Sequence, residues 1–235
     1  MSITENVRRI RAEMEKAALE AGRDPKEIKL CAATKMNDAA AVRQAIAAGV
    51  DCCGENRVQE LTQKLAENAY EGCEVHFIGH LQTNKVRQVV GKVSLIHSID
   101  SLRLLEAVSH EAQKQGIVQD ILLQVNIGHE DSKGGFWEDA LLQLLPKMVD
   151  FPNVRVKGLM AIPPICENSA GNDKFFQKMY NLSVDISAKK YDNVSVDIMS
   201  MGMSDDYANA ISCGSTMIRV GTAIFGARNY SAPHP

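Results

Sequence analysis

The stretch from Val75 to Asp100, VHFIGHLQTNKVRQVVGKVSLIHSID, contains two kinds of apolar pattern. Val75–Ile78 and Val93–Ile99 are short apolar runs of strand length, and the segment Leu81–Val90 between them is typical of a helix. A strand, a helix and a second strand in this order indicate a right-handed crossover between parallel strands. The stretch therefore predicts a parallel sheet.

The same alternation extends along the chain, after a first amphipathic helix expected from Thr4 to Ala21. The expected strands are Ile28–Thr34, Val50–Cys53, Val75–Ile78, Val93–Ile99, Ile121–Ile127, Val154–Ile162, Val194–Met201 and Met217–Phe225. The expected helices between them are Asp38–Ala48, Asn56–Asn68, Leu81–Val90, Ser101–Gln115, Trp137–Val149, Asp173–Lys190 and Asp205–Ile211. About eight strands, several apolar throughout, favour an α/β fold of the (β/α)8 TIM barrel type with an extra N-terminal helix. The alternative is an open doubly wound sheet, but no GxGxxG turn follows the first strand.

The amino-acid composition indicates a globular protein before any motif is considered. Of the 235 residues, 45% are hydrophobic and 23% charged, and the net charge is −3, so we expect one globular domain over residues 1–235. The slightly acidic balance predicts no nucleic-acid partner and no attachment to anionic membranes. The sequence shows no signal peptide or membrane span, which indicates a cytoplasmic protein. The six cysteines have no CxxC or Cys/His metal spacing and are predicted to be buried free thiols.

Active sites of this barrel type lie at the carboxyl ends of the strands. The run LCAATKMN, residues 30–37, places Lys35 at the end of the first strand, on the same face as Cys31 and Ala33. A desolvated lysine near other cations has a lowered pKa and can form a Schiff base. Taken alone, Lys35 is better explained as a rim lysine whose amine extends to solvent.

A second strand end carries the run SMGMSDDYANAI, residues 200–211. It predicts a glycine turn followed by a helix with Ser204 as its N-cap. The free backbone N–H groups of such a turn, with the hydroxyls of Ser200 and Ser204, could hold a phosphate, and Gly221-Thr222 ends the eighth strand nearby. A plain capped helix is the alternative.

Two further polar residues lie at or near strand ends. Arg219 interrupts an apolar strand and needs an acceptor, which could be a carbonyl, a ligand or a carboxylate such as Asp197 or Glu55. Asn56 could bind a ligand or cap the following helix. A lysine, a phosphate cradle and an arginine together suit a phosphorylated carbonyl compound. Two classes of protein remain, a Schiff-base aldolase without cofactor and a protein that holds pyridoxal 5'-phosphate.

Several motifs taken together resemble one known family. They are AATK at 32–35, GENRVQE at 54–60, HFIGHLQTNK at 76–85, KGLMAIP at 157–163, SMGMSDDY at 200–207 and IRVGTAIFGAR at 218–228. In this order they resemble the pyridoxal phosphate homeostasis protein family (YggS/PROSC), which is related to the N-terminal barrel of alanine racemase. The run DSKGGF at 131–136 departs from the family pattern in its second glycine.

The resemblance implies a set of cofactor-binding residues. Lys35 matches the lysine that forms the aldimine, and Arg219 matches the arginine facing the pyridine nitrogen. Asn56 matches a neighbouring asparagine, and the phosphate-binding stretches include Ser200, Met203, Ser204, Gly221 and Thr222. A permanently charged arginine keeps the pyridine nitrogen unprotonated, which supports carbanion chemistry poorly.

The resemblance therefore implies a pyridoxal phosphate-binding protein of vitamin B6 homeostasis rather than an enzyme. We expect a monomer that makes transient contacts with apo-enzymes. An amino-acid racemase-like enzyme is the alternative, and a cofactor-free aldolase is a third. Alanine racemases take a tyrosine base from a second domain, for which the expected barrel leaves no residues.

Overall fold

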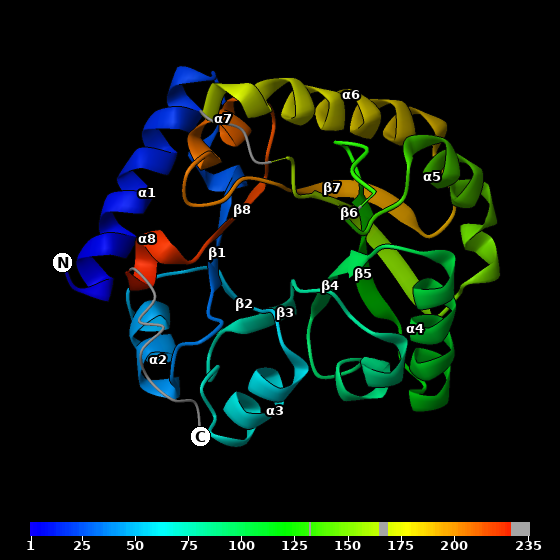
Figure 1. The fold of residues 1–235 in the computed structure, drawn as a ribbon, viewed down its shortest axis with the longest axis horizontal. Helices are drawn as coiled ribbons and strands as arrows, with labels where there is room; N and C mark the ends of the chain where they lie inside the picture. The colour runs from blue at the N-terminus through cyan, green and yellow to red at the C-terminus, as the bar shows by residue number, and fades with distance from the viewer. Residues whose placement is uncertain (132, 165–168, 227–235) are drawn as a thin grey trace.

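The eight expected parallel strands close into a barrel in chain order, β1 to β8, in the computed structural model (Figure 1). The structure describes residues 1–131, 133–164 and 169–226. The strands are β1 Lys29–Ala33, β2 Cys52–Glu55, β3 Glu74–Phe77, β4 Leu95–Ile99, β5 Gln119–Val125, β6 Val154–Ala161, β7 Val194–Ser200 and β8 Met217–Val220. The predicted (β/α)8 barrel is confirmed, and β8 pairs with β1 to complete it.

Helices surround the barrel, as the alternating pattern predicts (Figure 1). The α-helices are α1 Ile3–Glu20, α2 Ala39–Ala47, α3 Val58–Ala66, α4 Leu102–Gln115, α5 Glu138–Leu144, α6 Asp173–Lys189, α7 Tyr207–Ser212 and α8 Thr222–Phe225. The 3-10 segments are η1 Pro25–Glu27, η2 Thr83–Gln88, η3 Leu145–Asp150 and η4 Ser169–Asn172. Among the residues described, no helix combines the length and apolar character needed to cross a bilayer.

The extra N-terminal helix α1 begins with a capping box between Ser2 and Glu5, which satisfies two of its first N–H groups. Its buried face packs against α7 and α8, the elements that follow the last two strands. Asn6 Nδ2 donates to the carbonyl of Ile224 at 2.9 Å. The start of the chain is therefore fixed to its last helix.

Strand alternation separates two apolar layers. Leu30 and Ala32 of β1 join the large core between the sheet and the helices. Cys31 faces the barrel interior, where it packs with Cys52, Ile78 and Met217. This confirms the predicted inward face of the first strand.

Some expected elements differ from the structure. The strand predicted to run to Phe225 ends at Val220, because residues after Gly221 turn into the short helix α8. The helix predicted over 137–149 is divided into α5 and η3, since Pro146 has no N–H to continue the α-helical pattern. The segment Thr83–Gln88 is a 3-10 helix rather than an α-helix.

The helix after β7 also begins later than predicted. Its N-cap is Asp206, and Ser204 lies before it in the loop. The Asp206 carboxylate accepts from the amide of Met203 at 2.7 Å, so it closes the turn that Ser204 was expected to cap. The corrected boundary leaves the Ser204 hydroxyl available for another contact.

Candidate functional site

Neighbouring strands bring three of the predicted residues to one edge of the barrel. Lys35, Asn56 and Thr222 follow β1, β2 and β8, and these three strands are adjacent in the sheet. The β8 end lies close to the β1 end, since a Cβ added to Gly221 would be 3.3 Å from the carbonyl oxygen of Ala33. The carboxyl edge of the sheet therefore gathers residues that are far apart in sequence.

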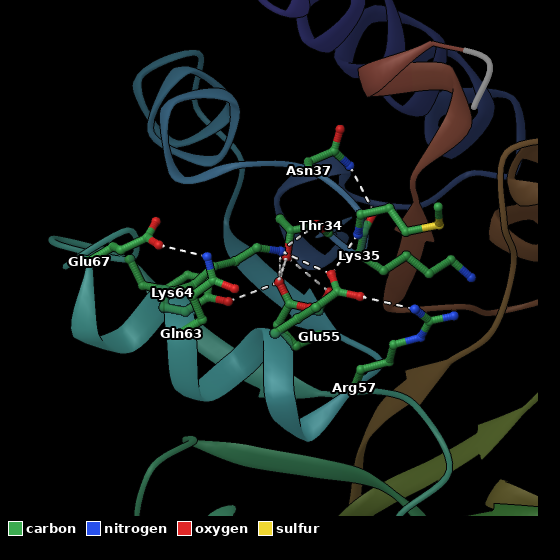
Figure 2. Close-up of polar contacts among 12 residues, drawn as sticks. Thr34, Lys35, Asn37, Glu55, Arg57, Gln63, Lys64 and Glu67 are labelled. Carbon is green, nitrogen blue, oxygen red and sulfur yellow. Dashed lines mark hydrogen bonds and ion pairs between the residues drawn. The ribbon is translucent and has the colours of Figure 1, made fainter. Parts of the chain in front are cut away.

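The turn that carries Lys35 is held by its neighbours. Asn37 Nδ2 donates to the carbonyl of Lys35 at 3.0 Å, and the amide of Met36 donates to Glu60 Oε2 at 2.6 Å. Met36 has a φ of 62°, which bends the chain away from the strand. The side chain of Lys35 is half-buried, and Figure 2 shows it extending away from the carboxylate of Glu55.

A different lysine, Lys64, neutralises Glu55. Lys64 Nζ lies 2.6 Å from Glu55 Oε1 and also donates to the carbonyl of Thr34 at 2.7 Å (Figure 2). Thr34 Oγ1 and the Tyr70 hydroxyl donate to the same carboxylate oxygen at 2.5 and 2.9 Å. Burial, with the Glu55 charge, raises the pKa of Tyr70, which keeps its phenol protonated. This buried cluster fixes the residue directly before Lys35 and makes Glu55 a structural group.

Arg219 is buried inside the barrel without a carboxylate partner among the described residues. Its Nη1 donates to Ser200 Oγ at 2.6 Å, and its Nη2 donates to the carbonyl of Ala161 at 3.0 Å. The salt bridge considered above is wrong for both acids: Asp197 pairs with Lys157, and Glu55 pairs with Lys64. Burial lowers the pKa of Arg219 to about 10, so the guanidinium remains charged at neutral pH.

A hydrogen-bonded chain leads from Arg219 across the interior. Ser200 Oγ lies 3.0 Å from His97 Nδ1, and His97 Nε2 lies 3.0 Å from His76 Nδ1. Arginine can only donate, so the Ser200 hydroxyl directs its proton to His97, which then donates to His76. Burial lowers the pKa of His76 to about 4 and that of His97 well below its usual range. Both rings are therefore neutral at physiological pH.

The loop after β7 reaches the first turn of α8. Ser204 Oγ accepts from the amide of Ala223 at 3.4 Å. Gly202 adopts a φ of 93°, and a Cβ there would lie 2.6 Å from Ala210 Cβ. Asn172 Nδ2 donates to the buried Asp206 carboxylate at 2.7 Å, which holds the loop from its other side. The first N–H groups of α8 have no acceptor within their own helix.

The predicted site residues fall into two groups. Lys35, Asn56, Ser204, Gly221 and Thr222 lie on the segments that follow the strands, whereas Ser200 and Arg219 lie within β7 and β8 and contact each other inside the barrel. The Met203 side chain is 38% exposed, and its amide is already bonded to Asp206. Asn56 does not cap the next helix, whose N-cap is Arg57. Among described side chains, Asn56 Oδ1 is a buried atom without a hydrogen-bond donor.

Comparison with known proteins places the chain in a family. Residues 2–229 match the model of the family described as alanine racemase, N-terminal domain. A pyridoxal phosphate homeostasis protein of Aquifex aeolicus is 40% identical over 230 residues, covering 98% of this chain and 100% of the relative. One from Escherichia coli K12 is 39% identical over 233 residues, covering 97% and 98%.

The chain belongs to the pyridoxal phosphate homeostasis protein family. The PipY protein of Synechococcus elongatus, solved with pyridoxal phosphate bound, superimposes with a TM-score of 0.79 at 33% identity, covering 91% of this chain and 100% of that one. The alanine racemase of Streptomyces coelicolor has a TM-score of 0.69 at 17% identity, covering 96% of this chain and 58% of that one. The second likeness shows the shared barrel fold alone.

The role of His97 in the barrel of this family member could not be predicted from residue types alone. His97 holds Ser200, which in turn holds Arg219, although His97 lies in a strand that reads simply as apolar. The isolated histidine in SLIHSI was the available signal. Its partner on β7 is more than a hundred residues away and becomes visible only in the fold.

Proposed function

We propose that the chain binds pyridoxal 5'-phosphate at the carboxyl end of the barrel and acts in intracellular homeostasis of this cofactor. The observation that carries the proposal is the buried, charged Arg219, which among the described residues has two neutral acceptors and no carboxylate. A buried guanidinium needs acceptors for its remaining donors, and a ligand with acceptor atoms fits this need. The membership of a family whose named relatives are homeostasis proteins supports the same ligand.

The described residues fit the separate parts of such a ligand. The amine of Lys35, on a turn fixed by Asn37 and Glu60, would hold the cofactor covalently. Asn56 Oδ1, buried without a donor among the described atoms, can accept a hydrogen bond from the ligand. When bound, the cofactor supplies an aldehyde that condenses with amines and a ring that can withdraw electrons.

We assign the phosphate to the loop after β7 and the first turn of α8. The hydroxyls of Ser204 and Thr222 and the backbone N–H of Thr222 are donors of the kind that a phosphate requires. Met203 contributes a side chain at the edge of this loop rather than its amide, which Asp206 occupies. Ser200 has an indirect role inside the barrel, because its hydroxyl accepts a hydrogen bond from Arg219 and positions that side chain.

We further propose that the protein binds its cofactor with little or no turnover. Arg219 donates and cannot give up its proton at neutral pH, so it would face an unprotonated ring nitrogen. His97 and His76 behind it are neutral because burial lowers their pKa values. The chain of hydrogen bonds thus offers the ring no proton that would strengthen it as an electron sink.

Absorption spectroscopy with borohydride trapping tests the binding proposal. Incubation with pyridoxal phosphate should give a new absorption band, and peptide mapping after reduction should find the adduct on Lys35. Lys35→Ala should abolish both, while Lys29→Ala, at the other end of the same strand, should preserve both. A wild-type protein that stays unlabelled would refute the proposal.

Turnover, assembly and location need separate measurements. Assays with L- and D-alanine and other amino acids should show no robust racemisation, and turnover that depends on Lys35 would favour the racemase-like alternative. We propose a cytoplasmic monomer that passes cofactor to apo-enzymes in transient contacts. Sedimentation of the protein, fractionation of cells and transfer of cofactor to an apo-enzyme test these three statements.

A further inference from the structure

Two cysteines and a histidine meet inside the barrel, below the Lys35 rim and beside Arg219. Cys31 and Cys52 are direct partners on β1 and β2, and His76 lies on the next strand, β3. One ligand atom from each lies within 4.8 Å of the other two. The three residues are 0%, 1% and 3% exposed, respectively. The sequence showed no Cys/His metal spacing because the three ligand types come from three separate strands.

The position of this cluster is toward the amino-terminal end of the barrel. Cys52 pairs in register with Glu74, the first residue of β3, whose side chain is 64% exposed. Lys35, in contrast, follows the carboxyl end of β1. A ligand of the cluster would therefore lie below the Lys35 rim, on the level of Arg219, and the inference does not rest on the proposed function.

We propose that Cys31, Cys52 and His76 form a binding site for a single copper(I) ion. Two thiolates and an imidazole are soft or borderline ligands, which favour copper(I) or zinc over hard cations. Structural zinc sites have four ligands from cysteine, histidine or carboxylate. Cys31 and Cys52 also pack with Ile78 and Met217, which add no zinc ligand to the three, whereas the Met217 thioether is a ligand type that suits copper(I).

The histidine is arranged to bind through one nitrogen while the other remains held. His76 Nδ1 lies 3.0 Å from His97 Nε2, whereas His76 Nε2 has only the looser contact of 3.4 Å with Glu74. Nε2 is therefore the nitrogen left for the metal. Binding there requires the Nδ1 tautomer, which reverses the hydrogen bond to His97 and leaves the ring neutral.

Charge and protons balance in the bound state. Cys31 and Cys52 are free thiols, and each gives up its proton when its sulfur binds the ion. Binding forms two copper–sulfur bonds and one copper–nitrogen bond and releases two thiol protons to solvent. Two thiolates and one monovalent cation leave a net charge of −1. Arg219, the register partner of Cys31 on β8, carries the compensating positive charge.

Competition with a coloured copper(I) chelate, bicinchoninate, tests the site under anaerobic reducing conditions. The wild-type protein should remove about one equivalent of copper(I) per chain and release about two protons. Cys31→Ser and Cys52→Ser should each weaken capture at least about tenfold, the expected effect of losing a ligand. Cys213→Ser removes a half-buried thiol next to α7 and should leave capture unchanged.

X-ray absorption of the copper-loaded wild-type protein tests the same assignment without any variant that could misfold. The expected nearest shell contains at least two sulfur atoms and one imidazole nitrogen. A shell of oxygen and nitrogen alone, capture that survives the loss of both Cys31 and Cys52, or stoichiometric zinc binding in preference to copper(I) would each overturn the proposal.

Discussion

Lys64 and Glu55 form a buried ion pair, with 2.6 Å between Nζ and Oε1, directly behind the turn that presents Lys35. The two lysines thus have opposite roles within one small region. Lys64 neutralises the carboxylate and holds the carbonyl of Thr34, whereas the side chain of Lys35 extends in another direction (Figure 2).

Replacing Lys64 should test how much the fold depends on this pair. Lys64→Met leaves the Glu55 charge buried with neutral partners only, and the free energy of unfolding should fall by about 3–5 kcal/mol. Urea denaturation measures this change. The double variant Glu55→Leu/Lys64→Met should recover part of the loss, because it removes the uncompensated charge. A single variant as stable as wild type would show that the pair has no structural role.

Ser200 lies inside the barrel and should influence cofactor binding through its hydrogen bond with Arg219. Ser200→Ala removes the acceptor 2.6 Å from Arg219, and we expect affinity for pyridoxal phosphate to fall about 10- to 100-fold, the usual value of a hydrogen bond to a charged group. Fluorescence titration measures the affinity, and the absorption band of the bound form should shift as Arg219 moves. Ser195→Ala on the same strand should do neither. An unchanged spectrum would mean that Ser200 does not position Arg219.

The phosphate assignment predicts a difference between two ligands. Thr222→Val removes a hydroxyl from the first turn of α8 and should weaken pyridoxal phosphate far more than pyridoxal. Parallel titrations with the two compounds give the ratio. Equal weakening of both would place the phosphate elsewhere on the barrel.

Gly202 should tolerate no side chain. Gly202→Ala combines a φ of 93° with a Cβ only 2.6 Å from Ala210 Cβ, so we expect a loss of about 2–4 kcal/mol from strain and overpacking together. Gly22→Ala is the matched control, because Gly22 has a φ of 68° but nothing within 4 Å of the added Cβ. Thermal denaturation compares the two. Equal losses would show that backbone strain alone matters.

A contact between α1 and α7 should give stability that depends on pH. The Tyr207 hydroxyl donates to Glu13, which lowers the pKa of that carboxyl below its ordinary value of 4.5. A lowered carboxyl pKa stabilises the fold above 4.5, and this contribution is lost as pH falls through the lowered value. Tyr207→Phe should therefore be less stable than wild type at pH 7 and converge with it in acid. A constant difference at all pH values would contradict this.

The barrel could be predicted from the sequence because its strands and helices carry separate, local patterns. Eight apolar runs divided by helical segments are sufficient to indicate parallel strands, and Lys35 stands out at the end of the first. The helix α8 was predicted as strand, since IRVGTAIF contains residues that suit either structure. Local propensity could not separate them there.

The contacts inside the barrel could not be predicted from the sequence, for a different reason. His97 and Ser200, or Cys31 and Cys52, come together only through strand register, which the sequence does not specify residue by residue. Likewise, Lys64 lies in α3, 30 residues after Thr34 in the sequence. Nothing in the run KLAENAY indicates that this lysine pairs with a glutamate at a strand end. The cofactor role was predicted through the family resemblance together with the strand ends.

The anchoring of α1 to α8 has a consequence for synthesis of the protein on the ribosome. Asn6 cannot meet its acceptor, the carbonyl of Ile224, until the segment that contains Ile224 has left the exit tunnel. The closing pair of strands, β1 and β8, is also separated by most of the sequence. A nascent chain that already carries Lys35 therefore cannot close the barrel beside this residue until β8 has been made.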